Sequence, residues 1–527
     1  MSDLFAGLDV STQSCKLIVI DYDEKTSIFL DSVNYDRDLP KYNTENGARK
    51  EAGFGVSESD PNMWIDAIHI LFRRLQDKIK ADISKIKSIS VSGQQHGLVT
   101  IDKNGDLSRK YSKLWNDFST VEECEILTKQ VGGEEKMIEL IGNTQRTGYT
   151  APKIFHMVRN EPENYKNTET IFLVHNYINW ILTGGNNGGI VAMESGDVSG
   201  SALWDPVSKH WADTVISAIA PDLKQKLPPV KNNREFLGNI GKEFVKKYGF
   251  STECKIASGS GDNMMGAIGT GNYTEGVVTI SLGTSGTAYT FMKDVYVDPK
   301  GEIACFCDAT GNYLPLLCVS NMANGYEAYL KTFKFDHQSF DEALQDSEPG
   351  NGGKVLCPWF EGERTPDLPQ AAPIYFGFTK VDDFMTDSLM RALMEGPILN
   401  LYDGFQRLPV NPQEIRLTGG ISKSAVWRET IANIFNCDVV HVLGEAAAMG
   451  AALHAAWSYY KDKNINEIAL PFIDLDESSR IEPDPALVKR YKDLVEIFTA
   501  VSRRIRGLDA DDPFKLFKEF NEKYTEK

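Results

Sequence analysis

Apolar residues along the chain fall into short runs and into helically spaced sets, which predicts strands alternating with helices. The segment 60–79 places Trp64, Ile68 and Leu71 on one helical face, and Asp60 with Pro61 suits the start of that helix. Strands are predicted for three apolar runs of the first half: 4–10, 16–21 and 88–93. A first half of this kind indicates an α/β fold.

The segment 276–292 repeats the pattern of the opening segment 6–21: an apolar strand, a small hydroxyl-bearing turn and a second apolar strand. Aligning Thr12 with Thr284 sets Asp9 opposite Ser281. The two segments lie about half the chain apart, so we expect two related domains that each begin with such a hairpin.

The second half continues with strands and helices that predict a sheet covered by helices. These elements are expected at 414–420, 425–435, 437–442 and 445–460. An amphipathic helix is predicted at 484–505, and the last seven residues, 521–527, are expected to fray. We divide the chain into an N-terminal domain, 1–257, which contains the first hairpin, and a C-terminal domain, 258–527, which contains the second.

The content of charged residues excludes some classes of binding partner. The 56 Lys and Arg residues face 74 Asp and Glu residues, and a net charge of −18 repels nucleic acids and anionic membranes. The N-terminal residues do not resemble a signal peptide, and no apolar run approaches the ~20 residues of a membrane helix. We therefore expect a cytoplasmic protein whose eight cysteines are reduced core thiols without a metal.

Two short turns, one in each repeat, place hydroxyl side chains between apolar strands, and the second turn also contains glycine. Such turns often only reverse the chain, but they also direct backbone N–H groups at phosphate oxygens. Lys16 follows the first turn and adds a positive charge. The sequence contains neither Gly-x-x-x-x-Gly-Lys-Ser/Thr nor His-Arg-Asp, which excludes P-loop and protein-kinase mechanisms.

Five glycines surround Asp262 in the segment 257–271. One interpretation is a tight turn in which Asp262 caps the following helix. The other makes Asp262 a general base that faces Asp9 across a cleft, because phosphoryl transfer needs a base, a metal and donors around the phosphate. Gln95 and His96 follow a predicted strand and suit a polyhydroxylated ligand, although a single histidine is often structural.

Several segments in order give the chain a resemblance to the FGGY carbohydrate kinases: "DVSTQSCK", "YTAPKI", "GSGDN", "SLGTSGT", "GERTP", "LTGGISKSAVWRETIANIF" and "EAAAMGAA". The resemblance runs from about Leu4 to Tyr460. It implies a two-domain, actin-like fold of ribonuclease-H-like domains, with a catalytic cleft between them. It also implies ATP and Mg²⁺ as cofactors and phosphorylation of a sugar hydroxyl.

The resemblance assigns roles to individual residues. Asp262 matches the catalytic base, and Asp9 matches the carboxylate that helps hold the metal beside Asp262. The phosphate-binding and adenosine-binding positions are Thr12, Gln13, Gly283, Thr284, Gly419, Gly420 and Ser424, to which the residues themselves add Lys16. For the sugar we expect contacts from Gln95, His96, Asp262 and Asn263.

Within the family, "QQHG", "LWND" and "GVSESDP" are most similar to the xylulokinases, so D-xylulose is the expected substrate. Ser119 and Gly196 depart from the usual pattern, which has Arg and Ser at these places. Another ketopentose or a polyol, such as ribulose or glycerol, is an alternative substrate. Two alternatives belong to other classes of protein: a non-catalytic sugar or nucleotide sensor, and a nucleotide switch that acts on a protein. The sequence leaves open whether the chain forms a homodimer.

Overall fold

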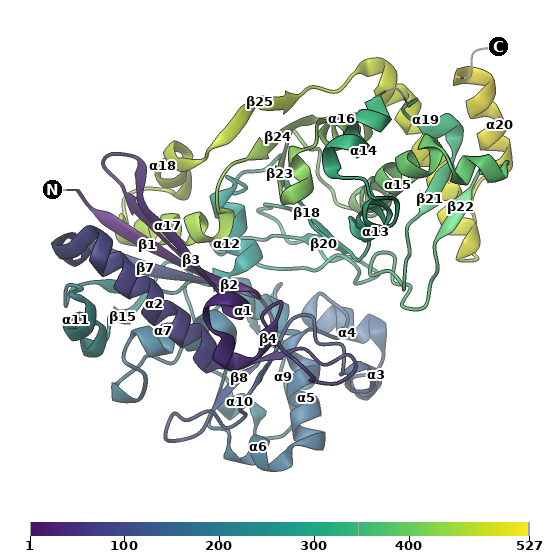
Figure 1. The fold of residues 1–527 in the computed structure, drawn as a ribbon. Helices are drawn as coiled ribbons and strands as arrows, with labels where there is room; N and C mark the ends of the chain where they lie inside the picture. The colour runs from purple at the N-terminus through teal and green to yellow at the C-terminus, as the bar shows by residue number, and fades with distance from the viewer. Residues whose placement is uncertain (1, 346, 525–527) are drawn as a thin grey trace. The chain divides into compact units, whose positions relative to one another are not determined.

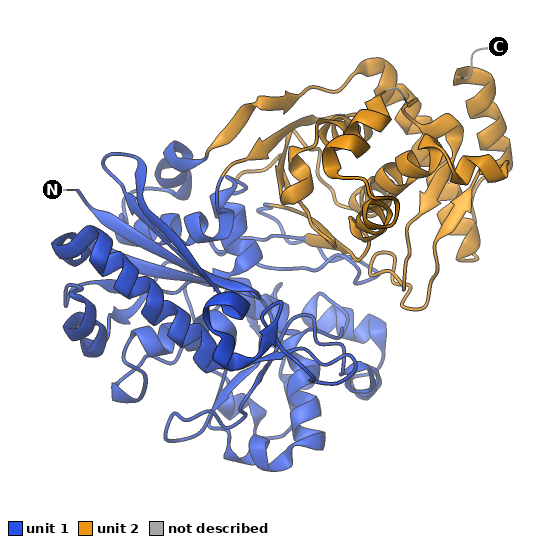
Figure 2. Ribbon diagram, viewed as in Figure 1, with its two compact units in different colours: residues 1–273, 291–315, 444–473 blue, residues 274–290, 316–443, 474–527 orange. Residues whose placement is uncertain are grey.

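The computed structural model describes residues 2–345 and 347–524 (Figure 1), and the chain divides into two compact units. Figure 2 shows unit 1, formed by 1–273, 291–315 and 444–473, and unit 2, formed by 274–290, 316–443 and 474–527. Each unit is built around one mixed β-sheet covered by helices, as an α/β fold requires.

The sheet of unit 1 has the strand order β15-β16-β7-β1-β2-β3, and β17 also pairs with β7. Strand β1 runs antiparallel to β2 and parallel to β7, and all of its residues are buried. The strands are β1 (Leu4–Val10), β2 (Ser14–Asp21), β3 (Thr26–Asn34), β7 (Ile86–Gly93), β15 (Phe236–Asn239), β16 (Lys255–Ala257) and β17 (Ser260–Gly261). The three strands predicted in the first half are confirmed.

The sheet of unit 2 has the order β20-β19-β18-β23-β24-β25, with the same strand directions. Its strands are β18 (Val277–Leu282), β19 (Gly286–Thr290), β20 (Leu316–Val319), β23 (Glu414–Thr418), β24 (Asp438–Val442) and β25 (Leu475–Ile481). The hairpin β18-β19 therefore corresponds to β1-β2, and β23 corresponds to β7. This correspondence confirms the predicted repeat.

Helices cover both faces of the sheet in unit 1. Helix α2 (Pro61–Ile79) begins as predicted, because the Asp60 side chain accepts a hydrogen bond from the backbone N–H of Asn62 at 2.9 Å. Its apolar face shares a buried core with Ala6 and Leu8 of β1. Gly7 points to the opposite face, since neighbouring strand residues alternate, and there it meets α17 (Ala446–Tyr459).

Close backbone packing assigns α12 (Asp262–Gly269) and α17 to unit 1. A Cβ atom on Gly7 would lie 2.1 Å from the carbonyl oxygen of Ala448, so only glycine admits α17 to this distance from β1. A Cβ atom on Gly450 would lie 1.8 Å from the carbonyl oxygen of Met265, which brings α12 equally close to α17. Both helices therefore pack with the first sheet and belong to unit 1. The predicted domain boundary at residue 257 stays a prediction.

The C-terminal part confirms one expectation and corrects another. Helix α19 (Pro485–Ile505) occupies the predicted amphipathic segment. The expected fraying of 521–527 is wrong for 521–524, which belong to α20 (Pro513–Tyr524), while 525–527 lie outside the described residues. Helix α20 is anchored by buried Phe520 and by the Tyr524 hydroxyl, which donates to Asp493 at 2.7 Å.

The state of the cysteines and the apolarity of the helices were also predicted from the sequence. All eight cysteines are free thiols, seven of them buried, as the sequence predicted. Among the described residues, no helix combines the length and apolarity that crossing a bilayer demands.

Candidate active site

Asp9 lies at the carboxyl end of β1, where it faces Lys16 on β2 and Ser92 on β7. Only 3 % of its surface is exposed, and its two oxygens accept hydrogen bonds from the hydroxyls of Ser92 at 2.9 Å and Ser11 at 2.5 Å. Burial raises the pKa of Asp9, and the two hydroxyls and the charge of Lys16 oppose that rise. The two hydrogen bonds therefore fix the orientation of the carboxylate, and the charge of Lys16 does not fully offset the effect of burial on its pKa.

The turn after Asp9 contains the first predicted phosphate residues, Thr12 and Gln13. The Thr12 hydroxyl accepts a hydrogen bond from the Trp115 indole at 2.9 Å and donates to Oε1 of Gln94 at 3.3 Å. The carbonyl of Gln13 accepts from the backbone N–H of Tyr35 at 3.0 Å, while its side chain is exposed. Both residues belong to an ordered turn, and their contacts with phosphate stay a prediction.

Lys16 forms an ion pair that the sequence analysis did not identify. Its ammonium group lies 2.6 Å from Oε2 of Glu445, a residue 429 positions away in the chain. Glu445 directly precedes α17, so the packing of that helix on the sheet brings the pair together. The predicted phosphate contact of Lys16 stays a prediction, and it would compete with Glu445.

Asp262 is the first residue of α12, and the helix is capped by Gly261 without a side-chain hydrogen bond. Its carboxylate accepts from the backbone N–H of its neighbour Asn263 at 2.9 Å. The alternative interpretation of Asp262 as an N-cap is therefore wrong. Strand β17 pairs Gly261 with Gly93 of β7, which places Asp262 in the same unit as Asp9.

Asp262 has the electrostatic properties of a general base. Burial, together with the negative charges of Asp9 and Asp197, raises the pKa of Asp262 to about 7. A carboxylate with a pKa near neutrality accepts a proton more readily than an ordinary aspartate, and about half of it is ionised at pH 7.

The sugar-side residues meet next to Asp262. The side-chain amide of Asn263 donates to Oε1 of Gln95 at 2.7 Å, whereas Nε2 of Gln95 is buried without a hydrogen-bond partner. The ring of His96 packs against Tyr149 and Phe306, with centroid distances of 4.8 and 5.9 Å. The structure thus brings the four predicted sugar residues into unit 1, next to the ends of β7 and β17.

A buried acidic cluster behind Asp262 was missed by sequence reasoning. Nδ1 of His175 lies 2.9 Å from Oδ2 of Asp197, and Nε2 of the same ring lies 3.7 Å from Oε1 of Glu194. Burial raises the pKa of Glu194 to about 7, although the charge of His175 opposes the shift. Glu194 and Asp197 are close in sequence, but His175 reaches them only through tertiary packing, so no local pattern identified the cluster.

The two departures from the family pattern have structural explanations. The Ser119 hydroxyl donates to Asp117 at 2.6 Å and accepts from Lys113 at 2.8 Å, so it completes a buried ion pair. A Cβ atom on Gly196 would lie 2.4 Å from the hydroxyl oxygen of Ser260. Glycine is therefore required at 196 while Ser260 keeps its hydrogen bond to Glu194.

Unit 2 contains the remaining predicted nucleotide residues. Gly283 and Thr284 form the exposed turn between β18 and β19. Gly419 follows β23 with φ +94°, and its Cβ atom would lie 2.3 Å from the carbonyl oxygen of Leu282, so the two glycine turns are neighbours. Gly420 faces open space, and Ser424 caps α16 (Ala425–Phe435) by accepting from a backbone N–H at 3.3 Å.

The donor set around Asp9 and Asp262 fits Mg²⁺. Over residues 2–345 and 347–524, no cluster of three His, Cys, Asp or Glu side chains could hold a metal by itself. Mg²⁺ is commonly bound by one or two carboxylates, waters and substrate phosphates, and buried Asp9 and half-buried Asp262, whose charges interact, are carboxylates of this kind.

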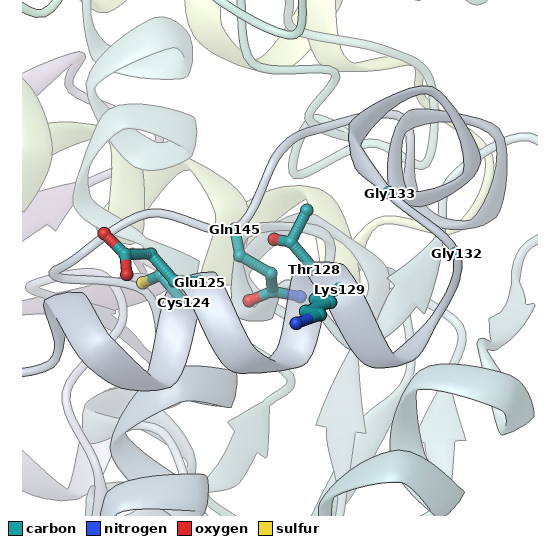
Figure 3. A pocket seen from close by; sticks show the side chains of 7 residues that line it. All are labelled: Cys124, Glu125, Thr128, Lys129, Gly132, Gly133 and Gln145. Carbon is teal, nitrogen blue, oxygen red and sulfur yellow. The ribbon is translucent and has the colours of Figure 1, made fainter.

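A hollow of about 650 Å³ elsewhere in unit 1 contains none of the predicted site residues (Figure 3). It is lined by Cys124 and Thr128 of α3 (Val121–Gln130), by Gly132, and by Gln145. Its size alone does not make it the active site, because Glu125 is the one carboxylate in its lining and neither Asp9 nor Asp262 reaches it.

The repeated sheets, the two glycine turns of unit 2 and a carboxylate whose pKa is raised to about 7 define a two-domain α/β phosphotransferase. The chain belongs to the FGGY family of carbohydrate kinases: the model of the family's N-terminal domain matches residues 4–269, and that of its C-terminal domain matches 278–459. It is therefore a carbohydrate kinase.

Individual relatives agree with this assignment. The chain is 34 % identical to a xylulose kinase of Haemophilus influenzae over 503 residues, which cover 94 % of this chain and 98 % of the relative. The structure of a "xyloylose kinase" from Brucella ovis is similar with a TM-score of 0.85, at 24 % identity over 96 % of this chain and all of the other. That of a xylulose kinase from Bifidobacterium adolescentis has a TM-score of 0.78, at 26 % identity over 93 % and 99 %.

Proposed function

We propose that this kinase transfers the γ-phosphoryl group of ATP to the terminal hydroxyl of D-xylulose and forms D-xylulose 5-phosphate. The observation that carries the proposal is the similarity to the xylulose kinase of Haemophilus influenzae over nearly the whole of both chains. The pairing of Gln95 with Asn263 beside Asp262 supports it, because these amides offer hydrogen bonds to several sugar hydroxyls.

The reaction requires a base at the attacking hydroxyl. Asp262 accepts the hydroxyl proton as the sugar oxygen forms its bond to the γ-phosphorus, and the bond from phosphorus to the β,γ-bridging oxygen breaks to release ADP. Burial and the charge of Asp9, which raise the pKa of Asp262, suit it to hold that proton. Mg²⁺ held by Asp9 and Asp262 would neutralise negative charge on the phosphate oxygens.

The other residues bind and orient. We assign the sugar to Gln95, His96 and Asn263, and the phosphates to backbone N–H groups of the turns at Thr12 and Gly283. Gly419, Gly420 and Ser424 are assigned to adenosine, since Gly420 leaves open space beside the turn. We also place the reaction in the cytoplasm, a compartment that suits the free thiols of all eight cysteines.

A coupled assay for ADP release tests the proposal over a panel of ketoses, polyols and sugar acids. We expect ADP to appear only with Mg²⁺ and a sugar, and D-xylulose to have the highest kcat/KM. A clear preference for D-ribulose or glycerol would make the chain a kinase for another substrate. Equal ADP release with and without every sugar would favour a nucleotide switch, and no release at all would favour a sensor.

Replacement of His96 tests the sugar contacts separately. We expect His96→Ala to raise the KM for D-xylulose by ~5- to 150-fold with little change in the KM for ATP, because a sugar hydroxyl loses its partner in a closed site. Unchanged kinetics toward every sugar would make His96 a structural residue.

A further inference from the structure

The segment "YTAPKI" at 149–154, one of the family-like motifs, has no role in the site described so far. It forms the beginning of α5 (Thr150–Asn160), and Tyr149 is the N-cap residue. Three of its side chains converge on His96. The Tyr149 ring packs on the imidazole, while Lys153 and Thr150, one helical turn apart, both reach the backbone carbonyl of His96.

His96 has a backbone conformation that needs support. Its φ of +64° lies in the left-handed region, which is unfavourable for residues with a side chain. The carbonyl accepts hydrogen bonds from Nζ of Lys153 at 2.7 Å and from the hydroxyl of Thr150 at 3.3 Å. These two bonds fix the direction of the peptide plane and therefore the direction in which the imidazole leaves the backbone.

Lys153 is unusual in its surroundings. Its side chain is fully buried, and none of the ion pairs among the described residues includes it. Burial lowers the pKa of Lys153 well below its usual value, and the charges of Asp117 and Asp197 only partly oppose this. Burying an amine costs free energy, and the hydrogen bond to the carbonyl of His96 partly offsets that cost.

The imidazole itself has little room to move. A Cβ atom on Gly200 would lie 2.5 Å from Cε1 of His96, so the ring touches the backbone there. Phe306 lies on another side with a ring centroid distance of 5.9 Å. A rotated peptide plane at His96 would therefore drive the ring against its neighbours or away from its position.

We propose that Lys153 is a positioning residue for the sugar site: it binds the carbonyl of His96 and thereby holds the His96 imidazole in its sugar-binding position. The part of this proposal that concerns sugar rests on the proposed function. Lys153 is fully buried and donates its hydrogen bond to the carbonyl of His96, so we expect its effect on sugar binding to pass through His96.

The first test is steady-state kinetics of Lys153→Met, which keeps the apolar stem and removes the donor. We expect the KM for D-xylulose to rise ~5- to 50-fold, with kcat and the KM for ATP within about twofold of wild type. Thr150→Val removes the longer bond and should raise the same KM by about two- to fivefold. It also serves as the second variant if Lys153→Met does not fold.

Lys226→Met is the matched control. Nζ of Lys226 also donates to a backbone carbonyl, that of Thr168 at 2.6 Å, in the same unit. This variant should leave all three kinetic constants unchanged. If it raised the sugar KM as much as Lys153→Met, a general loss of packing would explain both results and the proposal would fall.

A double variant tests whether Lys153 acts through His96. In the His96→Ala background, Lys153→Met should change the sugar KM by less than about twofold, since the ring to be positioned is gone. An undiminished rise in that background would overturn the proposal.

The second test does not depend on the substrate. The protein has eight histidines, and the ¹⁵N ring signals of His96 can be assigned by their loss in His96→Ala. We expect them to shift in Lys153→Met and not in Lys226→Met. If they shift while His96→Ala leaves every sugar KM unchanged, the positioning role stands and the sugar role of His96 falls; unshifted signals refute the positioning role itself.

Discussion

The side-chain amide of Asn263 donates a hydrogen bond to Oε1 of Gln95 over 2.7 Å, and so joins the first turn of α12 to the segment that follows β7. Asp262 precedes Asn263, and His96 follows Gln95. The bond therefore connects the proposed base to the proposed sugar contacts within one compact unit. Contacts within unit 1 therefore fix the proposed base and the proposed sugar-binding residues relative to one another.

Replacing Asp262 by Asn tests the base. The amide keeps the shape of the side chain but does not accept the proton, so we expect kcat to fall by roughly 10²- to 10⁴-fold. Nucleotide affinity, measured by calorimetry with ADP, should stay within a few-fold of wild type. A kcat close to that of wild type would show that Asp262 only supports the start of α12.

Replacing Asp9 by Asn tests the metal site. The variant loses one negative charge, so we expect a higher Mg²⁺ concentration at half-maximal rate together with a lower maximal rate. Both follow from titrating the assay with Mg²⁺ at saturating ATP. Ser92→Ala, which removes one hydrogen bond to Asp9 and leaves its charge, is the control and should have the smaller effect. An Mg²⁺ titration of Asp9→Asn that overlays wild type would contradict the role.

The pKa of Asp262, raised to about 7, predicts the direction of the pH dependence. A base works only when it is deprotonated, so kcat/KM for the sugar should fall as the pH drops below the pKa of Asp262. Asp197→Asn removes a charge that raises this pKa, and it should shift the acidic limb to lower pH by up to about one unit.

Asp213→Asn is the matched control for that pH profile. Asp213 is a surface carboxylate of the same unit that pairs with Lys224. Its replacement should leave the acidic limb where wild type has it. If both variants shifted the limb equally, the limb would report overall charge rather than Asp262.

The glycine at 196 gives a prediction about stability. Gly196→Ala brings a methyl group against the Ser260 hydroxyl, and we expect it to lower the free energy of unfolding by about 1–3 kcal/mol. Thermal denaturation with and without the second substitution Ser260→Ala measures the clash. The double variant should be less destabilised than the sum of the single variants, and strict additivity would exclude the clash.

Much of the fold could be predicted because its signals are local. The apolar run of β1 and the helical spacing after Asp60 each depend on neighbouring residues only, and the structure confirms both. The repeat of the opening hairpin also predicted that two sheets share one plan, since equivalent hairpins need equivalent neighbours. Fraying at 521–524 was the exception, because the Asp493 contact of Tyr524 is remote in sequence.

The site was less predictable where it depends on contacts between distant segments. The motifs identified Asp9, Asp262 and Gln95 as candidates, but the sequence placed Asp262 across a cleft from Asp9. Both lie in unit 1, because glycine contacts pack α12 and α17 closely. The ion pair of Lys16 with Glu445 and the cluster around His175 have no local pattern, since each forms only after the chain has packed.

The close packing of α17 also affects how the protein is made. On the ribosome, the sheet of unit 1 is complete once β16 and β17 have emerged, yet the helix that covers β1 through Gly7 follows only after residue 445. Until then the nascent chain exposes the surface at Gly7 that α17 later fills, a condition in which chaperones commonly bind. Expressing 1–273 alone would make this state permanent, so we expect that fragment to aggregate unless a peptide covering 444–473 is supplied in trans.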